Sequence, residues 1–211
     1  MLITMSGKHA KRFQISKMDR LDALERRERQ PAAPLLEILR PRAGEVVVDL
    51  GAGTGYFAIP MAHMVRTDDG GGRVIALDAE PRMLEVLGER AAGAGVAEAI
   101  VPVAVSGADT ERLPVEDGGA DLILAVNLVH ELDERSRAFD ECRRIVAPDG
   151  RLAVVDWDPE AAMDWGPPAD HRLAAGEVEE ELRSAGFEAV SRLRVYESHY
   201  VLVARPHGTA G

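Results

Sequence analysis

An acidic residue followed by closely spaced glycines is the part of this sequence best suited to bind a small molecule. Asp49 comes directly before the glycine-rich segment at positions 51–55. Glycines let the backbone turn tightly and let a ligand approach the main chain. A carboxylate at this point repels phosphate but suits an ammonium group or hydroxyl groups, so we expect a ligand that is cationic or neutral at that end. The turn residues expected to contact it are Gly51, Gly53, Thr54 and Gly55.

A second carboxylate, Asp78, ends the next predicted buried strand, at positions 74–77. Its two oxygens can accept hydrogen bonds from both hydroxyls of a ribose. Alternatively, Asp78 is simply an acid near a helix N-terminus, because Pro81 begins the next predicted helix. The glycine turn upstream favours the ribose role.

Two further polar residues, Asn127 and His130, follow a predicted strand at positions 121–126. In an open α/β sheet the ligand crevice lies beyond the carboxyl ends of the strands, so these residues should lie where cofactor and substrate meet. A histidine with an ordinary pKa could accept a proton from a hydroxyl or amine nucleophile. His130 could equally be a helix-capping residue or a wall of the site.

The elements around the glycine turn are those needed to position it. Three consecutive valines at 46–48 predict a strand buried on both faces, as in a parallel sheet. After the turn the apolar spacing becomes helical, and the residues expected on the inner face are Phe57, Met61, Met64 and Val65. A strand, a glycine turn and a helix in this order bind a nucleotide-like cofactor at the end of the first strand.

The spacing of the glycines selects among cofactors. A dinucleotide fingerprint, G-x-G-x-x-G, would need a glycine where Tyr56 stands. A phosphate-binding loop would end in Gly-Lys-Ser/Thr, which is absent from this turn. A nicotinamide-dependent oxidoreductase therefore remains only as an alternative.

Composition limits which binding partners and which cellular compartment we expect. The formal net charge is −11, which disfavours nucleic acid as a substrate. Cys142 is the one cysteine, so no intrachain disulfide can form, and no stretch is apolar and long enough to span a membrane. We expect a soluble, cytoplasmic protein. Asp156 and Asp158 lack further ligands at suitable spacing, so no metal is expected.

The arrangement Asp-x-Gly-x-Gly-x-Gly at 49–55 resembles motif I of the class I methyltransferases that use S-adenosylmethionine (AdoMet). The Pro-x-Gly turn at 148–150 is a further resemblance, and the Asn-x-x-His at 127–130 is similar to ubiquinone/menaquinone-type and other small-molecule methyltransferases. The resemblance covers roughly residues 35–205. It implies AdoMet as cofactor and methyl transfer to O, N or C of a small molecule. The single cysteine disfavours the arsenic-methylating branch.

The resemblance also implies a fold. We expect an α/β domain with a doubly wound, seven-stranded, Rossmann-like sheet of order 3-2-1-4-5-7-6, whose last strand is antiparallel. This methyltransferase domain would span residues 41–211. Residues 1–40 would form an N-terminal helical extension, which begins with a capping box at 16–19 and serves either as packing or as a lid over the cofactor.

Residue roles follow from the resemblance. Asp49 and the glycine backbone would hold the methionyl ammonium group, and Asp78 would hold the ribose. Asp109 would meet the adenine amino group, although a surface aspartate in a loop is the alternative. Met83 would flank the adenine ring, or else pack in the core. Asn127 would border the line of methyl transfer.

A segment without periodicity at 160–173, together with Trp157, is the candidate wall for the acceptor. Its two tryptophans, Trp157 and Trp165, suit an apolar or aromatic substrate, and His171 with Arg172 could meet an anionic group. A structural flap is the alternative. A non-catalytic module that binds AdoMet and regulates a partner, and an enzyme that methylates protein, also remain open.

Overall fold

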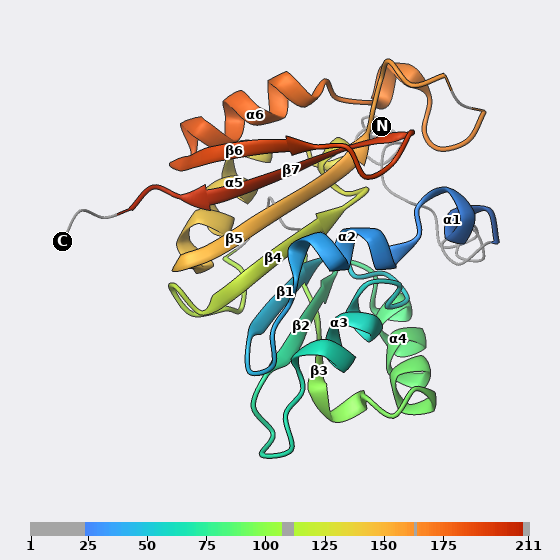
Figure 1. The fold of residues 1–211 in the computed structure, drawn as a ribbon, viewed down its shortest axis with the longest axis vertical. Helices are drawn as coiled ribbons and strands as arrows, with labels where there is room; N and C mark the ends of the chain where they lie inside the picture. Colours follow the sequence, from blue (N-terminus) through green and yellow to red (C-terminus); the bar gives the residue numbers. More distant parts are fainter. Residues whose placement is uncertain (1–23, 107–111, 163, 209–211) are drawn as a thin grey trace, which may run out of the picture.

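The computed structural model describes residues 24–106, 112–162 and 164–208, which build a mixed α/β sandwich around one sheet (Figure 1). The sheet order β3-β2-β1-β4-β5-β7-β6 confirms the prediction. The pairs from β3 to β5 are parallel, and β7 is antiparallel to β5 and to β6. The strands are β1 (Val46–Leu50), β2 (Arg73–Asp78), β3 (Ile100–Ala104), β4 (Ala120–Val126), β5 (Val146–Trp157), β6 (Phe187–Leu193) and β7 (His199–Pro206).

Helices cover both faces of the sheet (Figure 1). One apolar cluster joins one face to α2, α3 and α4, and a second joins the other face to α5 and α6. The helices are α1 (Leu24–Arg29), α2 (Ala32–Leu39), α3 (Ala58–Val65), α4 (Pro81–Gly93), α5 (Arg135–Ile145) and α6 (Ala175–Ser184). Short 3-10 turns are η2 (Ala97–Ala99), η3 (Val129–Glu131) and η4 (Ala169–His171).

Strand β1 lies at the centre of the sheet, between β2 and β4. Successive side chains of a strand point to opposite faces. Val47 therefore packs with α2, α3 and α4, whereas Val48 packs with α5 and α6. Both faces of β1 need apolar residues, which is why the sequence shows consecutive valines here instead of an alternating pattern.

Helix α2 is part of the packed body. Leu35, Leu36 and Leu39 are buried in the same cluster as Val47. Pro34 is tolerated because it lies in the first turn, where its missing N–H has no helical partner to lose. The expected capping box at 16–19 lies outside the described residues. Whether residues 1–40 act as a separate unit or a lid stays a prediction.

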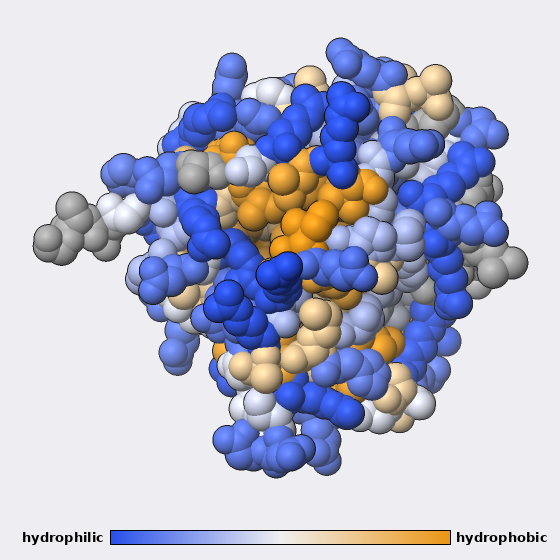
Figure 2. All heavy atoms as spheres, viewed as in Figure 1, coloured by the Kyte–Doolittle hydropathy of each residue, from blue (hydrophilic) through white to orange (hydrophobic). Residues whose placement is uncertain are grey.

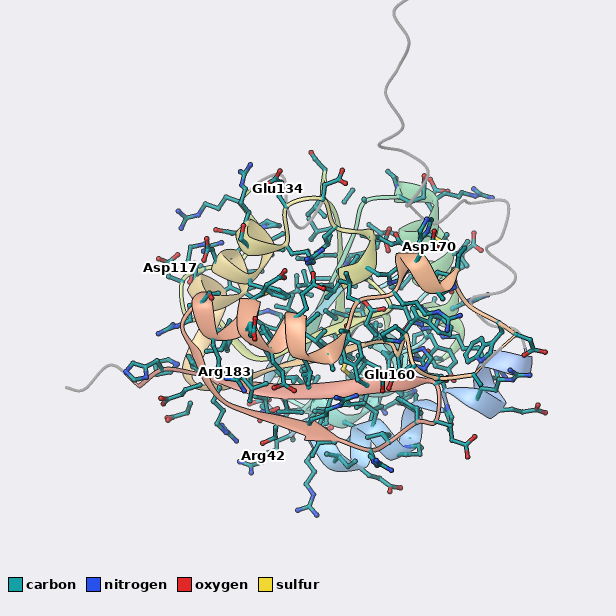
Figure 3. All side chains as sticks on the ribbon, turned by 90° about the horizontal axis from the view of Figure 1, so that it is seen from above. Arg42, Asp117, Glu134, Glu160, Asp170 and Arg183 are labelled. Carbon is teal, nitrogen blue, oxygen red and sulfur yellow. The ribbon has the colours of Figure 1, made fainter. Side chains whose placement is uncertain are left out.

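The face of the molecule seen in Figure 2 is mostly hydrophilic, with a restricted apolar area. Figure 2 shows apolar surface gathered near the middle of the viewed face. Ile38 of α2 is 47% exposed and is one of the large apolar side chains that reach solvent. Figure 3 shows the charged residues Arg42, Asp117 and Glu134 at the outer edge of the molecule. Among the described residues, no helix is long and apolar enough to cross a membrane.

If α2 belongs to the domain core, Leu35→Ala should lower the free energy of unfolding by about 2–5 kcal/mol, because it leaves a cavity under a fully buried side chain. Urea denaturation measures this change. Ile38→Ala on the exposed side of the same helix is the matched control and should shift stability by about 0.5 kcal/mol or less. Equal stability of the two variants would mean that α2 is a detachable extension.

Candidate active site

The glycine turn connects β1 to α3 at the sheet edge where the parallel strands end. Gly51, Gly53 and Gly55 all have positive φ angles, of 72°, 54° and 91°. A Cβ atom on Gly51 would lie 3.2 Å from Leu128 Cδ1, and one on Gly55 would lie 3.0 Å from Leu87 Cγ. The turn therefore needs glycine for its backbone conformation and for its close packing. A groove of about 600 Å³, lined in part by Thr54, Gly55 and Tyr56, runs beside it.

Asp49 carries the most unusual carboxylate of the site. Its side chain is buried at 3% exposure, and its Oδ2 atom has no hydrogen-bond partner among the described residues. Burial raises the pKa of Asp49 to about 7; the positive charge of Arg26 opposes this rise and the negative charge of Asp78 adds to it. A cationic group bound here would give the ionised carboxylate a partner and favour its charged form.

Asp78 ties the end of β2 to the glycine turn. Its Oδ2 accepts a hydrogen bond from the Gly53 amide at 2.7 Å, and its Oδ1 accepts one from the Glu80 amide at 2.9 Å. Burial raises the pKa of Asp78, and these backbone hydrogen bonds oppose the rise. Each carboxylate oxygen has a further lone pair, so Asp78 retains acceptor capacity for hydroxyl groups.

Two other predicted contact residues are buried near this point. Thr54 is 2% exposed, within the turn. Met83, in the first turn of α4, is 4% exposed, yet it belongs to neither of the two large apolar clusters of the described residues. This position is compatible with a role beside a ligand ring. Asp109 lies outside the described residues, so its contact with adenine stays a prediction.

Asn127 follows β4 and has a left-handed backbone, with φ 55°. Its side-chain amide pairs with that of Gln30: Asn127 Nδ2 donates to Gln30 Oε1 at 3.1 Å, and Gln30 Nε2 donates to Asn127 Oδ1 at 3.3 Å. Gln30 is completely buried. Sequence analysis missed Gln30, because a glutamine that ends a charged helix carries no pattern that indicates burial.

Two tyrosines hold the same N-terminal segment. The Tyr56 hydroxyl donates to the Gln30 carbonyl at 3.0 Å, and the Tyr196 hydroxyl donates to the Pro31 carbonyl at 2.8 Å. The Arg26 guanidinium lies 4.5 Å from the centre of the Tyr56 ring. Residues 26–31 are thus fixed over the carboxyl end of β4 by the glycine turn on one side and by the β6–β7 connection on the other.

His130 is oriented by a buried carboxylate. Its Nδ1 lies 2.8 Å from Asp156 Oδ1, and its backbone amide donates to Asp156 Oδ2 at 3.0 Å. Asp156 is 1% exposed and also accepts a hydrogen bond from the Trp157 amide at 2.8 Å. If Nδ1 carries the proton toward the carboxylate, Nε2, which lies 3.8 Å from Glu131 Oε1, is the ring nitrogen with a lone pair for a substrate proton. The sequence interpretation considered Asp156 only as a metal ligand and rejected it. Its position near the end of β5, which neighbours the β4 strand that precedes His130, is the signal that could have identified it.

The two tryptophans of the predicted acceptor wall are in contact, and the wall itself stays a prediction. Trp157 and Trp165 meet edge to face, with ring centres 4.6 Å apart. Arg172, expected to face an anionic group, instead donates to the carbonyls of Pro167 and Trp165 within its own loop. His171 lies beside it, half-buried in η4.

The described residues contain no group of three or more histidine, cysteine or acidic side chains placed to hold a metal ion. Cys142 is buried in α5, and burial raises the pKa of its thiol to about 12. It packs as an apolar residue and is not a thiolate at neutral pH.

A seven-stranded sheet with one reversed strand, a glycine turn after β1 and an acid at the end of β2 define the class I methyltransferase fold. The family model for the methyltransferase domain matches residues 48–154, about half of the chain. The chain belongs to this family.

Relatives and solved structures agree with this family. The chain is 30% identical to an arsenite methyltransferase of Halobacterium salinarum, over 70% of this chain and 38% of the relative. It is 29% identical to a ubiquinone/menaquinone biosynthesis C-methyltransferase of Marinomonas sp., over 58% and 47%. A crystal structure of a SAM-dependent methyltransferase from Aquifex aeolicus matches with TM-score 0.81 and 26% identity, over 92% of this chain and 98% of that one. The chain spans less than two thirds of the length of these curated relatives.

The buried Asp49 carboxylate should make stability depend on pH. Its pKa is 3.8 without the fold and about 7 within it, so the folded protein holds an extra proton between these values. The free energy of unfolding should therefore fall as pH rises from about 4 to about 7. Asp49→Asn should reduce this fall, leaving the part due to the raised pKa of Asp78, and should stabilise the protein at pH 8 by on the order of 2–4 kcal/mol.

Urea denaturation at pH 5 and pH 8 measures the effect. Asp140→Asn, on the exposed side of α5, is the matched control and should keep the wild-type dependence. An Asp49→Asn protein with the wild-type pH dependence would mean that Asp49 is ionised and solvated.

Proposed function

We propose that this chain is an AdoMet-dependent methyltransferase that transfers a methyl group to O, N or C of a small-molecule acceptor. The observation that carries the proposal is the buried Asp49 oxygen without a partner, next to a positive-φ glycine turn and to Asp78. Family membership supplies the reaction class.

The residues present fit the cofactor. AdoMet has an ammonium group at one end, a ribose diol in the middle and an adenine ring at the other end. Asp49 suits the ammonium group, Asp78 suits the diol, and the buried Met83 would cover the ring. Bound AdoMet would supply a methyl group activated on a sulfonium.

The chain's own part in the reaction is to position the acceptor and to take its proton. Holding the two reactants in line supplies much of the acceleration of such a displacement. His130, fixed by Asp156, would accept the proton when the nucleophile is a hydroxyl or an amine. An acceptor that reacts without losing a proton would need positioning alone.

The N-terminal segment acts as a lid in this proposal. Residues 26–31 are held over the site by side chains from the glycine turn and the hairpin, through Tyr56 and Tyr196. Arg29 of α1 also pairs with Asp164 of the acceptor loop. A closed lid excludes water from the site and keeps the cofactor bound.

Several observations argue against the competing functions. Tyr56 occupies the third glycine position of a dinucleotide fingerprint, and family membership removes the main support for an oxidoreductase. The protonated, buried Cys142 speaks against an arsenite acceptor, although one relative carries that name. The cytoplasmic location and the exclusion of nucleic acid stay predictions from composition.

AdoMet and its demethylated product should bind, and Asp78→Ala should weaken the binding at least tenfold, because the ribose diol loses its carboxylate acceptor. Isothermal titration calorimetry measures both affinities. Asp140→Ala, on the exposed side of α5, is the control and should bind as the wild type does. Unchanged affinity in Asp78→Ala would remove Asp78 from the site.

Product binding without methyl transfer to a broad acceptor panel would favour the regulatory module.

With an oxygen or nitrogen acceptor found in that panel, His130→Ala should lower kcat by about 10²–10⁴-fold, since the proton acceptor is lost. Asp156→Asn should lower kcat less and change its pH profile, because the His130 ring loses the carboxylate that orients it. The KM for AdoMet should stay near the wild-type value in both variants. A wild-type kcat in His130→Ala would assign the residue to the wall of the site.

A further inference from the structure

The groove beside the glycine turn lies outside the cofactor contacts proposed above. Its volume of about 600 Å³ is within the range of about 300–1,000 Å³ that small-molecule sites occupy. One wall comes from the N-terminal segment, with Arg27 and residues 31–33, and the other comes from residues 54–56 and 59–60 and from Arg90 of α4. Of the described residues predicted to bind the cofactor, Thr54 and Gly55 are the two that line it.

The apolar part of the groove is held in place by contacts within the protein. The Tyr56 hydroxyl donates to the Gln30 carbonyl at 3.0 Å, and the Arg26 guanidinium lies 4.5 Å from the centre of the Tyr56 ring. Pro31 and Pro60 line the groove as well, and the ring of each fixes its own backbone φ angle. A ligand with an apolar body would meet a preformed wall, which reduces the entropy lost on binding.

The charged side chains that line the groove all have the same sign. Arg27 and Arg90 are among the lining residues, and no acidic residue is, although the whole chain has 36 acidic and 25 basic residues. Arg90 reaches toward the turn, because its Nη1 lies 3.5 Å from the Thr54 carbonyl oxygen. A guanidinium stays charged at neutral pH and matches the geometry of a carboxylate. Two such groups in one groove favour an anion.

Charge also separates the groove from the cofactor site. The carboxylates of Asp49 and Asp78 suit an ammonium group and hydroxyls, and neither residue lines the groove. The arginines of the groove would repel the ammonium and sulfonium groups of AdoMet. The two sides of the glycine turn therefore suit ligands of opposite charge.

We propose that this groove is a second binding site, for a small anion with an apolar body, such as a medium-chain carboxylate. Arg27 and Arg90 bind the negative group, and the body packs on Tyr56 and Ile59. Because Arg27 belongs to the N-terminal segment and Tyr56 to the glycine turn, the bound anion contacts both and holds them together. This site does not depend on the proposed methyl transfer.

Isothermal titration calorimetry of the full chain with octanoate tests the proposal. Three compounds remove one property each: octan-1-ol lacks the charge, octylammonium reverses it, and acetate lacks the apolar body. Octanoate should bind at least fivefold more tightly than each of the three, because the groove combines positive charge with an apolar wall. Absence of octanoate binding would overturn the proposal.

Arg27→Gln and Arg90→Gln should each weaken octanoate binding about tenfold, because one charge-assisted hydrogen bond is lost. Ala33→Glu keeps both arginines and places a carboxylate in the groove, so it should weaken binding at least tenfold. Ala33 is exposed in the first turn of α2, where an acidic side chain is favourable. Arg82→Gln is the matched control: it removes an exposed arginine of α4 that pairs with Glu85, and it should bind octanoate as the wild type does.

A repeat of the titration with saturating S-adenosylhomocysteine, the demethylated product of AdoMet, distinguishes the groove from the cofactor site. Octanoate should still bind. Its displacement would place octanoate in the cofactor site and overturn the proposal, as would equal binding of octanoate and octan-1-ol or wild-type affinity in Ala33→Glu. If S-adenosylhomocysteine itself does not bind, the methyltransferase proposal fails, and the groove variants decide the second site independently.

Discussion

The burial of one carboxylate in the central strand is the constraint on which the rest of the site depends. Asp49 lies in β1 between β2 and β4, and its neighbours in the strand are buried apolar residues. Hydrogen bonds on both sides of β1 hold the backbone, so the carboxylate cannot turn to solvent without breaking the sheet. Its desolvation is therefore built into the fold, and the simplest relief is a cation that arrives with a ligand. The Asp49 carboxylate thus belongs both to the protein core and to the binding site. Its burial lowers the stability of the fold and also leaves it able to bind a cation.

The parallel order of the central strands explains why the other functional groups gather near Asp49. Asp78 ends β2, Asn127 follows β4, and Asp156 lies one residue before the end of β5. Together with β1 these strands form the consecutive parallel set β2-β1-β4-β5, and parallel strands end at the same edge of a sheet. Strand β7 runs the opposite way, so it contributes its first residue, His199, to that edge. One reversed strand thus brings a residue 150 positions after Asp49 to the same site.

Local patterns in the sequence predicted the elements well, because burial repeats with the period of a strand or a helix. Three of the residues expected on the inner face after the glycine turn, Phe57, Met61 and Val65, are buried. Met64 was predicted to face inward but is 38% exposed, because α3 is short and its buried stripe is filled by Met61, Ala62 and Val65. Strand β5 begins at Val146 and therefore includes the Pro-x-Gly turn at 148–150. Its pairing with β4 shifts register across this turn, between Ala120 and Leu122. Asp109 stays a prediction.

Long-range pairings could not be predicted, because residue spacing does not say which distant side chains meet. Gln30 and Asn127 are 97 positions apart, yet each amide satisfies the other. The role of Asn127 beside the cofactor stays a prediction, and in the structure its side-chain amide pairs with Gln30 of the N-terminal segment. A ligand that uses the Asn127 amide must therefore exchange hydrogen bonds with Gln30, and Gln30 lies in the segment held by Tyr56 and Tyr196. For such a ligand, occupation of the site and the position of that segment would be linked through this amide pair, because a ligand shifts an equilibrium when it interacts differently with the two states.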